Sequence, residues 1–70
     1  MTNAFEVYGF DEDGQLVPHD HELFEGKQFV NPAAVITAVN DHFAGLDSEA
    51  KKKAEREAIG QFTILNVISY

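Results

Sequence analysis

The stretch Gln61-Phe-Thr-Ile-Leu-Asn-Val-Ile-Ser-Tyr70 decides the fold of this chain. It carries no charged residue, is rich in β-branched and aromatic side chains and directly follows Gly60, which are features of a β-strand. Because side chains alternate along a strand, Ile64 points to one side and Leu65 to the other, so both sides carry apolar residues. Such a pattern is typical of a strand covered on both faces. We therefore expect a strand over about 61–69 at the centre of a sheet.

The N-terminal residues predict a hairpin. Phe5–Phe10 has the composition of a strand, and the turn Asp11-Glu-Asp-Gly14 follows it, ending in a glycine that tolerates a left-handed backbone. Gln15–Val17 can return as the second arm up to Pro18, whose missing amide hydrogen indicates an edge strand, a bulge or the end of the pairing. Gly9, inside the first strand, indicates a bulge or a close approach of another segment. We expect the C-terminal strand to pair beside the first.

Two helices are predicted between the hairpin and the last strand. Asn31 is a good N-cap and Pro32 suits the first helical position, so a helix over 32–44 is expected, ending at Gly45 in the left-handed conformation. A second, highly charged helix over 47–59 should lie on the surface. Its narrow apolar seam consists of Ala50, Ala54, Ala58 and Ile59. The predicted core residues are Val35, Ile36, Val39, Phe43, Ile64 and Ile68.

These elements predict one small α+β domain over residues 1–70, with a small antiparallel sheet and both helices on one face, in the order β-β-(β)-α-α-β. Residues 19–30 leave two alternatives, a further strand or an ordered loop. A core of this size contributes roughly 3–5 kcal/mol of net stability. The chain has no cysteine to form a disulfide or a thiolate metal site. Self-association through the sheet face that the helices leave open is therefore expected as an alternative way to bury apolar surface.

The charge of the chain is −7 and is unevenly distributed. Residues 1–46 contain eight acidic residues and one lysine, whereas residues 47–70 contain four acidic and four basic residues. This acidity argues against direct binding to nucleic acids or anionic membranes and favours a protein partner with a basic surface. The N-terminus lacks a signal-peptide pattern and no apolar stretch approaches the length of a membrane span, so we expect a cytoplasmic protein.

The sequence contains no motif of a known catalytic type, and we expect neither an enzyme nor a cofactor. A glycine-rich phosphate loop and an EF-hand spacing are both missing. The strongest chemical candidate is His19-Asp20-His21, because two histidines two residues apart in an extended segment can share one metal ion, with His42 as a third ligand. Histidines at this spacing are also common in polar loops. We therefore interpret His19 and His21 as solvated loop residues and His42 as exposed, and expect no tightly bound metal.

The functional hypothesis from sequence is a small acidic protein-binding module that inhibits or regulates a nucleic-acid-binding partner. In this hypothesis carboxylates occupy the places of phosphates, as in acidic accessory proteins of phages and mobile elements. The expected partner-binding residues are Asp11, Glu12, Asp13, Asp20, Glu22 and Glu25. Two alternatives remain: a self-associating structural or assembly component, and a histidine-based metal-binding protein.

Overall fold

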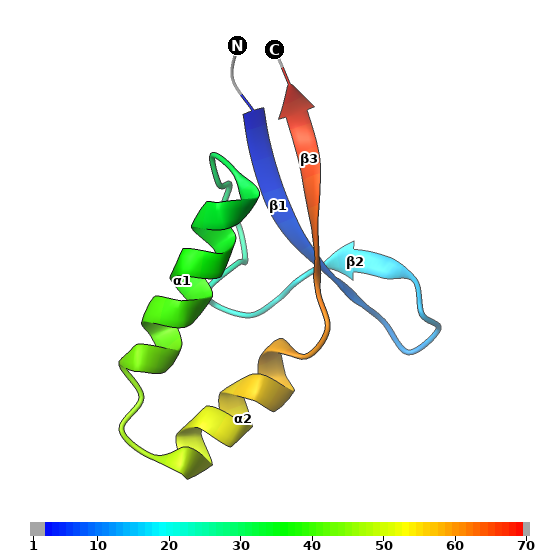
Figure 1. The fold of residues 1–70 in the computed structure, drawn as a ribbon. Helices are drawn as coiled ribbons and strands as arrows, with labels where there is room; N and C mark the ends of the chain where they lie inside the picture. The colour runs from blue at the N-terminus through cyan, green and yellow to red at the C-terminus, as the bar shows by residue number, and fades with distance from the viewer. Residues whose placement is uncertain (1–2, 70) are drawn as a thin grey trace.

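Within the residues that the structure describes, the chain forms a three-stranded antiparallel sheet and two helices (Figure 1). The structure is a computed structural model that describes residues 3–69, and side chains over residues 3–67. Strand β1 (Asn3–Phe10) lies between β2 (Leu16–Pro18) and β3 (Thr63–Ser69). Helices α1 (Pro32–Ala44) and α2 (Glu49–Ile59) connect β2 to β3 in sequence. The predicted α+β fold, with the last strand beside the first, is confirmed.

The C-terminal strand β3 lies at an edge of the sheet, so the prediction of a central strand was wrong. Among the described residues only β1 pairs with β3, and β1 itself is central because β2 occupies its other edge. An isolated bridge between Phe5 and Phe29 extends that second edge. The apolar side chains that alternate with Ile64 along β3 are only partly covered: Leu65 is half-buried and Val67 is 38% exposed.

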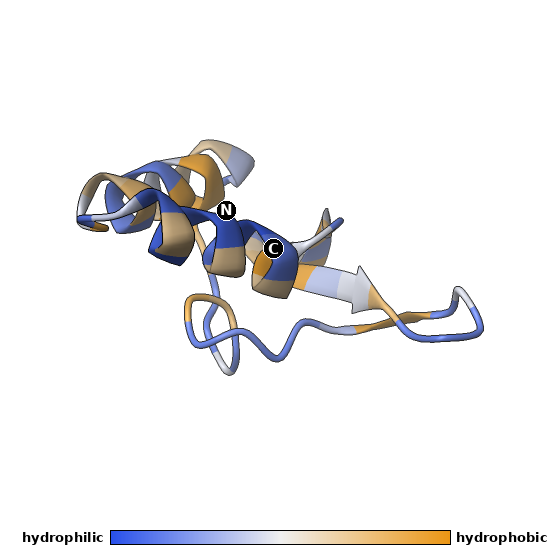
Figure 2. Ribbon diagram, turned by 90° about the horizontal axis from the view of Figure 1, so that it is seen from below, coloured by the Kyte–Doolittle hydropathy of each residue, from blue (hydrophilic) through white to orange (hydrophobic). Residues whose placement is uncertain are grey.

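The hairpin between β1 and β2 is built by the turn chemistry of Asp11. Its carboxylate accepts hydrogen bonds from the backbone N–H groups of Asp13 and Gln15, at 2.9 and 2.8 Å. Gly14 has φ 78°, the left-handed conformation expected for the last turn residue. The pairing ends at Pro18, which lies opposite Tyr8 at the sheet edge. Figure 2 shows the hairpin projecting away from the helices, with hydrophilic residues at its tip.

Both helices begin with a side-chain cap, and the cap of α1 is the predicted Asn31. Asn31 accepts a hydrogen bond from the N–H of Ala34 at 2.8 Å, and Ser48 accepts one from the N–H of Lys51 at 3.2 Å. The end of α1 differs from the prediction, because Gly45 has φ −83° and is right-handed. Its N–H donates to the last free carbonyls of the helix, which tightens the final turn without a left-handed residue. No helix among the described residues is both long enough and apolar enough to cross a lipid bilayer.

The core cluster joins four buried residues: Val7 of β1, Val35 of α1, Ile59 of α2 and Phe24 of the loop between β2 and α1. The predicted core residues Val39, Phe43 and Ile64 pack against this cluster and are confirmed. Ile36 is 47% exposed, so its assignment to the core was wrong. A helical step of about 100° carries it away from the face that Val35 buries. The side chain of Ile68 lies outside those described.

Helix α2 does not use its predicted alanine seam. Ala50, Ala54 and Ala58 are all exposed, so the predicted seam was wrong for these three residues and correct for Ile59 alone. The buried contact comes from Ile59 at the end of the helix, and the half-buried Glu55 lies one turn earlier on the same face. The helix therefore turns a carboxylate, not a methyl group, toward the interior.

Residues 19–30, called loop 19–30 below, form an ordered loop with turns; they do not form a third arm of the sheet. Phe24 is buried in the core, and Leu23 and Phe29 pack beside it. Two hydrogen bonds of 2.8 Å between the backbones of Phe5 and Phe29 attach the end of the loop to β1. The loop alternative from the sequence is therefore confirmed.

Candidate functional site

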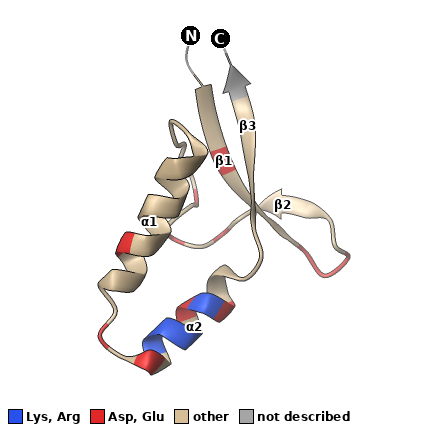
Figure 3. Cartoon of the chain, viewed as in Figure 1, with Lys and Arg blue, Asp and Glu red and all other residues tan. Residues whose placement is uncertain are grey.

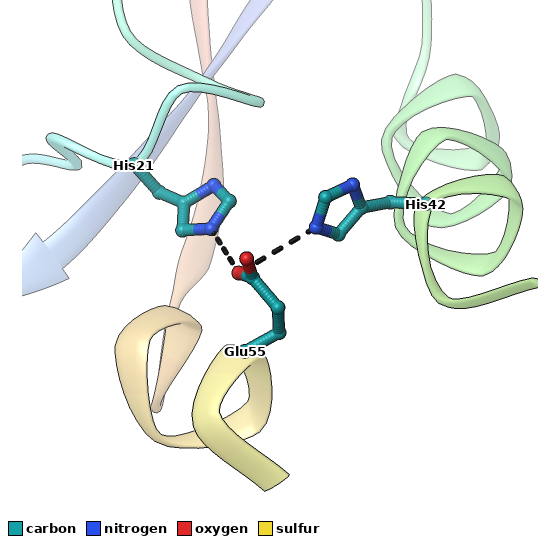
Figure 4. A group of neighbouring side chains, drawn as sticks. All are labelled: His21, His42 and Glu55. Carbon is teal, nitrogen blue, oxygen red and sulfur yellow. Dashed lines mark hydrogen bonds and ion pairs between the residues drawn. The ribbon is translucent and has the colours of Figure 1, made fainter. Parts of the chain in front are cut away.

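Three ionisable side chains from three separate segments meet beneath loop 19–30 (Figure 4). His21 comes from the loop, His42 from the last turn of α1 and Glu55 from α2. The Oε2 atom of Glu55 lies 2.6 Å from Nε2 of His21 and 3.5 Å from Nε2 of His42. The three side chains are only 8%, 19% and 26% exposed, respectively, so the cluster is sheltered from water but reachable.

The backbone of the loop fixes which nitrogen of His21 carries hydrogen. The N–H of Leu23 donates to Nδ1 of His21 at 3.1 Å, so Nδ1 acts as an acceptor and carries no hydrogen. The hydrogen of the neutral ring is then on Nε2, from which it is donated to Glu55. Loop 19–30 therefore orients His21 as a hydrogen-bond donor toward α2.

His19 uses the same arrangement for a different contact. Its Nδ1 accepts from the N–H of His21 at 3.1 Å, so its Nε2 donates to the backbone carbonyl of Ile59 at 2.7 Å. The ring is buried and occupies one of the carbonyls that the end of α2 leaves without an intrahelical partner. His19 thus has a structural role and does not belong to the His21 cluster.

Gly9 makes room for this ring. A Cβ atom at Gly9 would lie 3.2 Å from Cδ2 of His19, closer than the ordinary van der Waals distance. The close approach that a glycine inside the first strand indicated is therefore present, and the approaching group is the imidazole of His19.

The hydrogen bond from His21 holds the pKa of the Glu55 carboxyl below its ordinary value. Partial burial opposes this effect. The positive charge that His21 carries when protonated lowers the pKa further, and so do the polar contact and charge of His42. Glu55 is thus stabilised as a carboxylate at the junction of loop 19–30 with the two helices.

His42 is the incompletely satisfied member of the cluster. Its Nε2 atom is buried and makes no hydrogen bond to any described residue. The 3.5 Å contact with Glu55 becomes an ion pair only when the imidazole is protonated. A buried polar atom without a partner is uncommon in a folded protein and indicates a missing interaction.

The interpretation of the histidines as solvated residues was wrong, because His19 and His21 are sheltered by α2, whose contacting residues lie 40 and 34 positions later in the sequence. Sequence analysis also missed Glu55, which it placed on an exposed helix. One signal was available: Glu55 precedes Ile59 by four residues, so the two share a helical face. The expectation that the histidines hold no metal tightly stays a prediction. It was based on solvent-exposed histidines, however, and the structure shows His19 and His21 sheltered from solvent.

The six acidic residues expected to bind a partner, Asp11, Glu12, Asp13, Asp20, Glu22 and Glu25, are all exposed. Among the described residues none of them is in an ion pair. Lysines of α2 are paired locally instead, as in Lys51 with Asp47 at 2.9 Å. Figure 3 shows acidic and basic residues interleaved along α2, but only acidic ones at the hairpin tip.

Two of the six acidic residues share a groove of ≈ 570 Å³ between the base of the hairpin and the end of α2. Asp11 and Asp20 line it together with Glu57, which the sequence analysis did not select. Phe10 and Pro18 provide apolar parts of its wall. The other four carboxylates do not line this groove, so the structure gathers the predicted residues only in part.

Comparison of the chain with models of known protein families, with curated proteins and with solved structures finds no match.

Proposed function

We propose that this chain is a small, non-enzymatic protein-binding module that inhibits or regulates a partner with a basic, nucleic-acid-binding surface. The observation that carries the proposal is the groove lined by Asp11, Asp20 and Glu57. Its mixture of carboxylates and apolar wall suits a lysine or arginine side chain, whose hydrocarbon stem packs on apolar surface while its cationic end meets carboxylates. The hairpin tip adds further unpaired negative charge beside the groove.

Electrostatics determine how such binding should behave. Carboxylates without counterions attract a cationic surface over roughly 8–10 Å at moderate ionic strength. The attraction increases the association rate more than it slows dissociation, and salt screens it. Binding should therefore weaken as salt is added, mainly through a slower association.

The test compares the wild type with the triple variant Asp11→Asn, Glu12→Gln, Asp13→Asn. Partners are captured from a lysate at low salt, and the association rate of each purified partner is measured at low and high salt. Asparagine at 11 keeps the side-chain oxygen that accepts from Asp13 and Gln15, so the turn should stay folded. We expect partner binding to weaken by about tenfold or more, which corresponds to about 1.4 kcal/mol. If the partner binds the triple variant as tightly as the wild type at low and at high salt, the hairpin is only a solvated turn.

A second candidate function, self-association as a structural or assembly component, is favoured by the free edge of β3. Hydrogen-bonding direction alternates along an antiparallel strand. Phe5 directs its backbone groups toward the β2 side of β1, so those of Glu6 face β3, where Glu6 pairs with Leu65. The backbone groups of Ile64, which lies in regular register opposite Val7, therefore face away from the sheet. β3 has no charged residue and no proline, and among the described pairings only the register shift beside Asn66 interrupts this edge, which leaves it open to pairing with another strand.

A further inference from the structure

The cluster of His21, His42 and Glu55 contains the ligand set of a transition-metal site. Each residue offers one ligand atom, and these three atoms all lie within 4.8 Å of one another. Two imidazole nitrogens and one carboxylate oxygen are ligands that zinc accepts. Ligand atoms around a tetrahedral zinc ion lie about 3.3 Å apart, given bond lengths of about 2.0–2.1 Å. The atoms of His21 and Glu55, 2.6 Å apart, therefore need to separate by about 0.7 Å to admit an ion, whereas the 3.5 Å between His42 and Glu55 is already close to this spacing.

We propose that His21 Nε2, His42 Nε2 and a carboxylate oxygen of Glu55 bind a divalent transition-metal ion of the zinc class. The fourth position is left to water or to a ligand from a partner. The ligands come from loop 19–30, α1 and α2, so the ion would join three segments that are held together otherwise by few polar contacts. This proposal replaces the expectation, drawn from sequence, that the histidines are solvated and hold no metal.

A second observation, independent of the spacing, is the state of His42. Its Nε2 is buried without a hydrogen-bond partner among the described residues, and it lies on the side of the ring that faces Glu55. A bound ion would supply the missing interaction, since a neutral imidazole nitrogen is an electron-pair donor. The hydrogen bond between His21 and Glu55 does not satisfy His42, which in the metal-free protein has only the longer 3.5 Å contact with Glu55.

One feature of the loop limits the affinity. A metal ion at Nε2 of His21 displaces the hydrogen that this atom donates to Glu55, and the ring then carries its hydrogen on Nδ1. In the metal-free structure Nδ1 accepts a hydrogen bond from the N–H of Leu23. Metal binding must therefore break this hydrogen bond, and the loop backbone must adjust. We therefore expect moderate affinity, and the Leu23 amide should report on binding.

The experiment uses the full chain without an affinity tag, freed of metal with a chelator that is then removed. Zinc chloride is titrated by calorimetry, cobalt(II) is added to detect the visible bands of a tetrahedral site, and the amide spectrum is followed by NMR. We expect saturable binding of one ion per chain and a shift of the Leu23 amide. A melting temperature that rises with zinc should accompany it.

Two variants test the ligands without emptying the site. In Glu55→Gln the side-chain oxygen can still accept from His21, but the amide is a poor metal ligand. In His42→Phe the ring is kept and the ligand nitrogen is lost. Each variant should weaken zinc binding by more than the roughly 10–100-fold that is typical of losing a residue that only hydrogen-bonds to a metal ligand. The matched controls Asp41→Asn and Glu49→Gln remove one exposed negative charge from α1 and α2, respectively, and should bind zinc as the wild type does.

Circular dichroism of each metal-free variant establishes that it is folded before it is titrated. No saturable zinc binding by the folded wild type at tens of micromolar would overturn the proposal. Unchanged binding in both Glu55→Gln and His42→Phe would overturn it as well, since the ion would then be elsewhere. Either result would leave the cluster as a hydrogen-bonded junction.

Discussion

Glu55 accepts a hydrogen bond of 2.6 Å from Nε2 of His21, although the two residues are separated by 34 positions in sequence. The bond connects the middle of α2 to the start of loop 19–30. His19, two residues earlier, makes a second bond to the same helix through the carbonyl of Ile59. His19 and His21 therefore hold loop 19–30 against α2 at two points. The buried Phe24 lies three residues after His21.

The first prediction concerns the acid sensitivity of this junction in metal-free protein. Because the pKa of Glu55 lies below its ordinary value of 4.5 in the folded state, unfolding raises its affinity for a proton. Its contribution to stability is fully present above the ordinary pKa and is lost as the pH falls through the lower folded-state pKa. The urea midpoint should therefore fall more steeply below about pH 4.5 in the wild type than in Glu55→Gln, which has no proton to bind at this position. Parallel midpoint curves between about pH 3 and 7 would show that the bond is not coupled to folding.

The second prediction concerns the contact of Gly9 with His19. In Gly9→Ala the new methyl group would lie 3.2 Å from the imidazole. The ring cannot easily retreat, because it is buried and bonded to Ile59. We expect a loss of about 1–3 kcal/mol, the usual cost of overpacking, measured by urea unfolding. The control is Gly26→Ala, whose methyl group meets nothing within 4 Å but sits at φ 69°. Gly9→Ala should disturb the ring resonances of His19, whereas Gly26→Ala should leave them unchanged.

The third prediction separates two neighbouring helix residues that the sequence placed together in the core. Val35 is fully buried, whereas Ile36 is 47% exposed. Val35→Ala should lower the free energy of unfolding by about 1–3 kcal/mol through the cavity it leaves. Ile36→Ala should change it by less than about 0.5 kcal/mol, as surface substitutions do. Equal effects of the two substitutions would mean that α1 is rotated from the orientation described here.

These residues also show what local sequence could predict. The N-cap Asn31, the turn at Asp11 and the edge position of Pro18 depend on neighbours in sequence, so they were found correctly. The rotation of α1 depends on which segment fills the space beside it, and Phe24 of loop 19–30 takes that place. The periodicity of apolar residues in the sequence carries no information about this neighbour, so it could not show which of Val35 and Ile36 is buried. The junction of His21 with Glu55 depends likewise on contacts between distant segments, for which a single sequence carries little signal.

The fourth prediction tests the free edge of β3. If two copies pair through this edge, sedimentation at tens of micromolar should show a dimer. Asn66 is exposed, and Asn66→Lys places a positive charge on this edge, so it should abolish the dimer while the pairing of β1 with β3 is kept. Asn66→Ala adds no charge and serves as the control. A wild type that stays monomeric under these conditions would contradict pairing of two copies through β3. The exposed residues of β3, including Val67, would then contact another protein or form no interface.

The last prediction asks whether the groove itself, or only the negative charge around it, recognises a basic partner. Ala58 is exposed and lines the groove, so Ala58→Trp should fill part of it without changing any charge. Ala44, exposed at the end of α1 and outside this groove, offers the matched control Ala44→Trp. The probe is a short arginine-containing peptide amide, titrated by NMR at low salt.

If a cationic side chain enters the groove, the peptide should shift the amides around Asp20 and Gly60 in the wild type and in Ala44→Trp. In Ala58→Trp the affinity should fall by about tenfold or more, because the side chain loses its place between the carboxylates while the long-range attraction stays the same. A peptide that binds all three proteins equally, with shifts spread over the hairpin tip, would mean that attraction is diffuse. Recognition of the partner would then depend on the charge of Asp11, Glu12 and Asp13 and not on a shaped site.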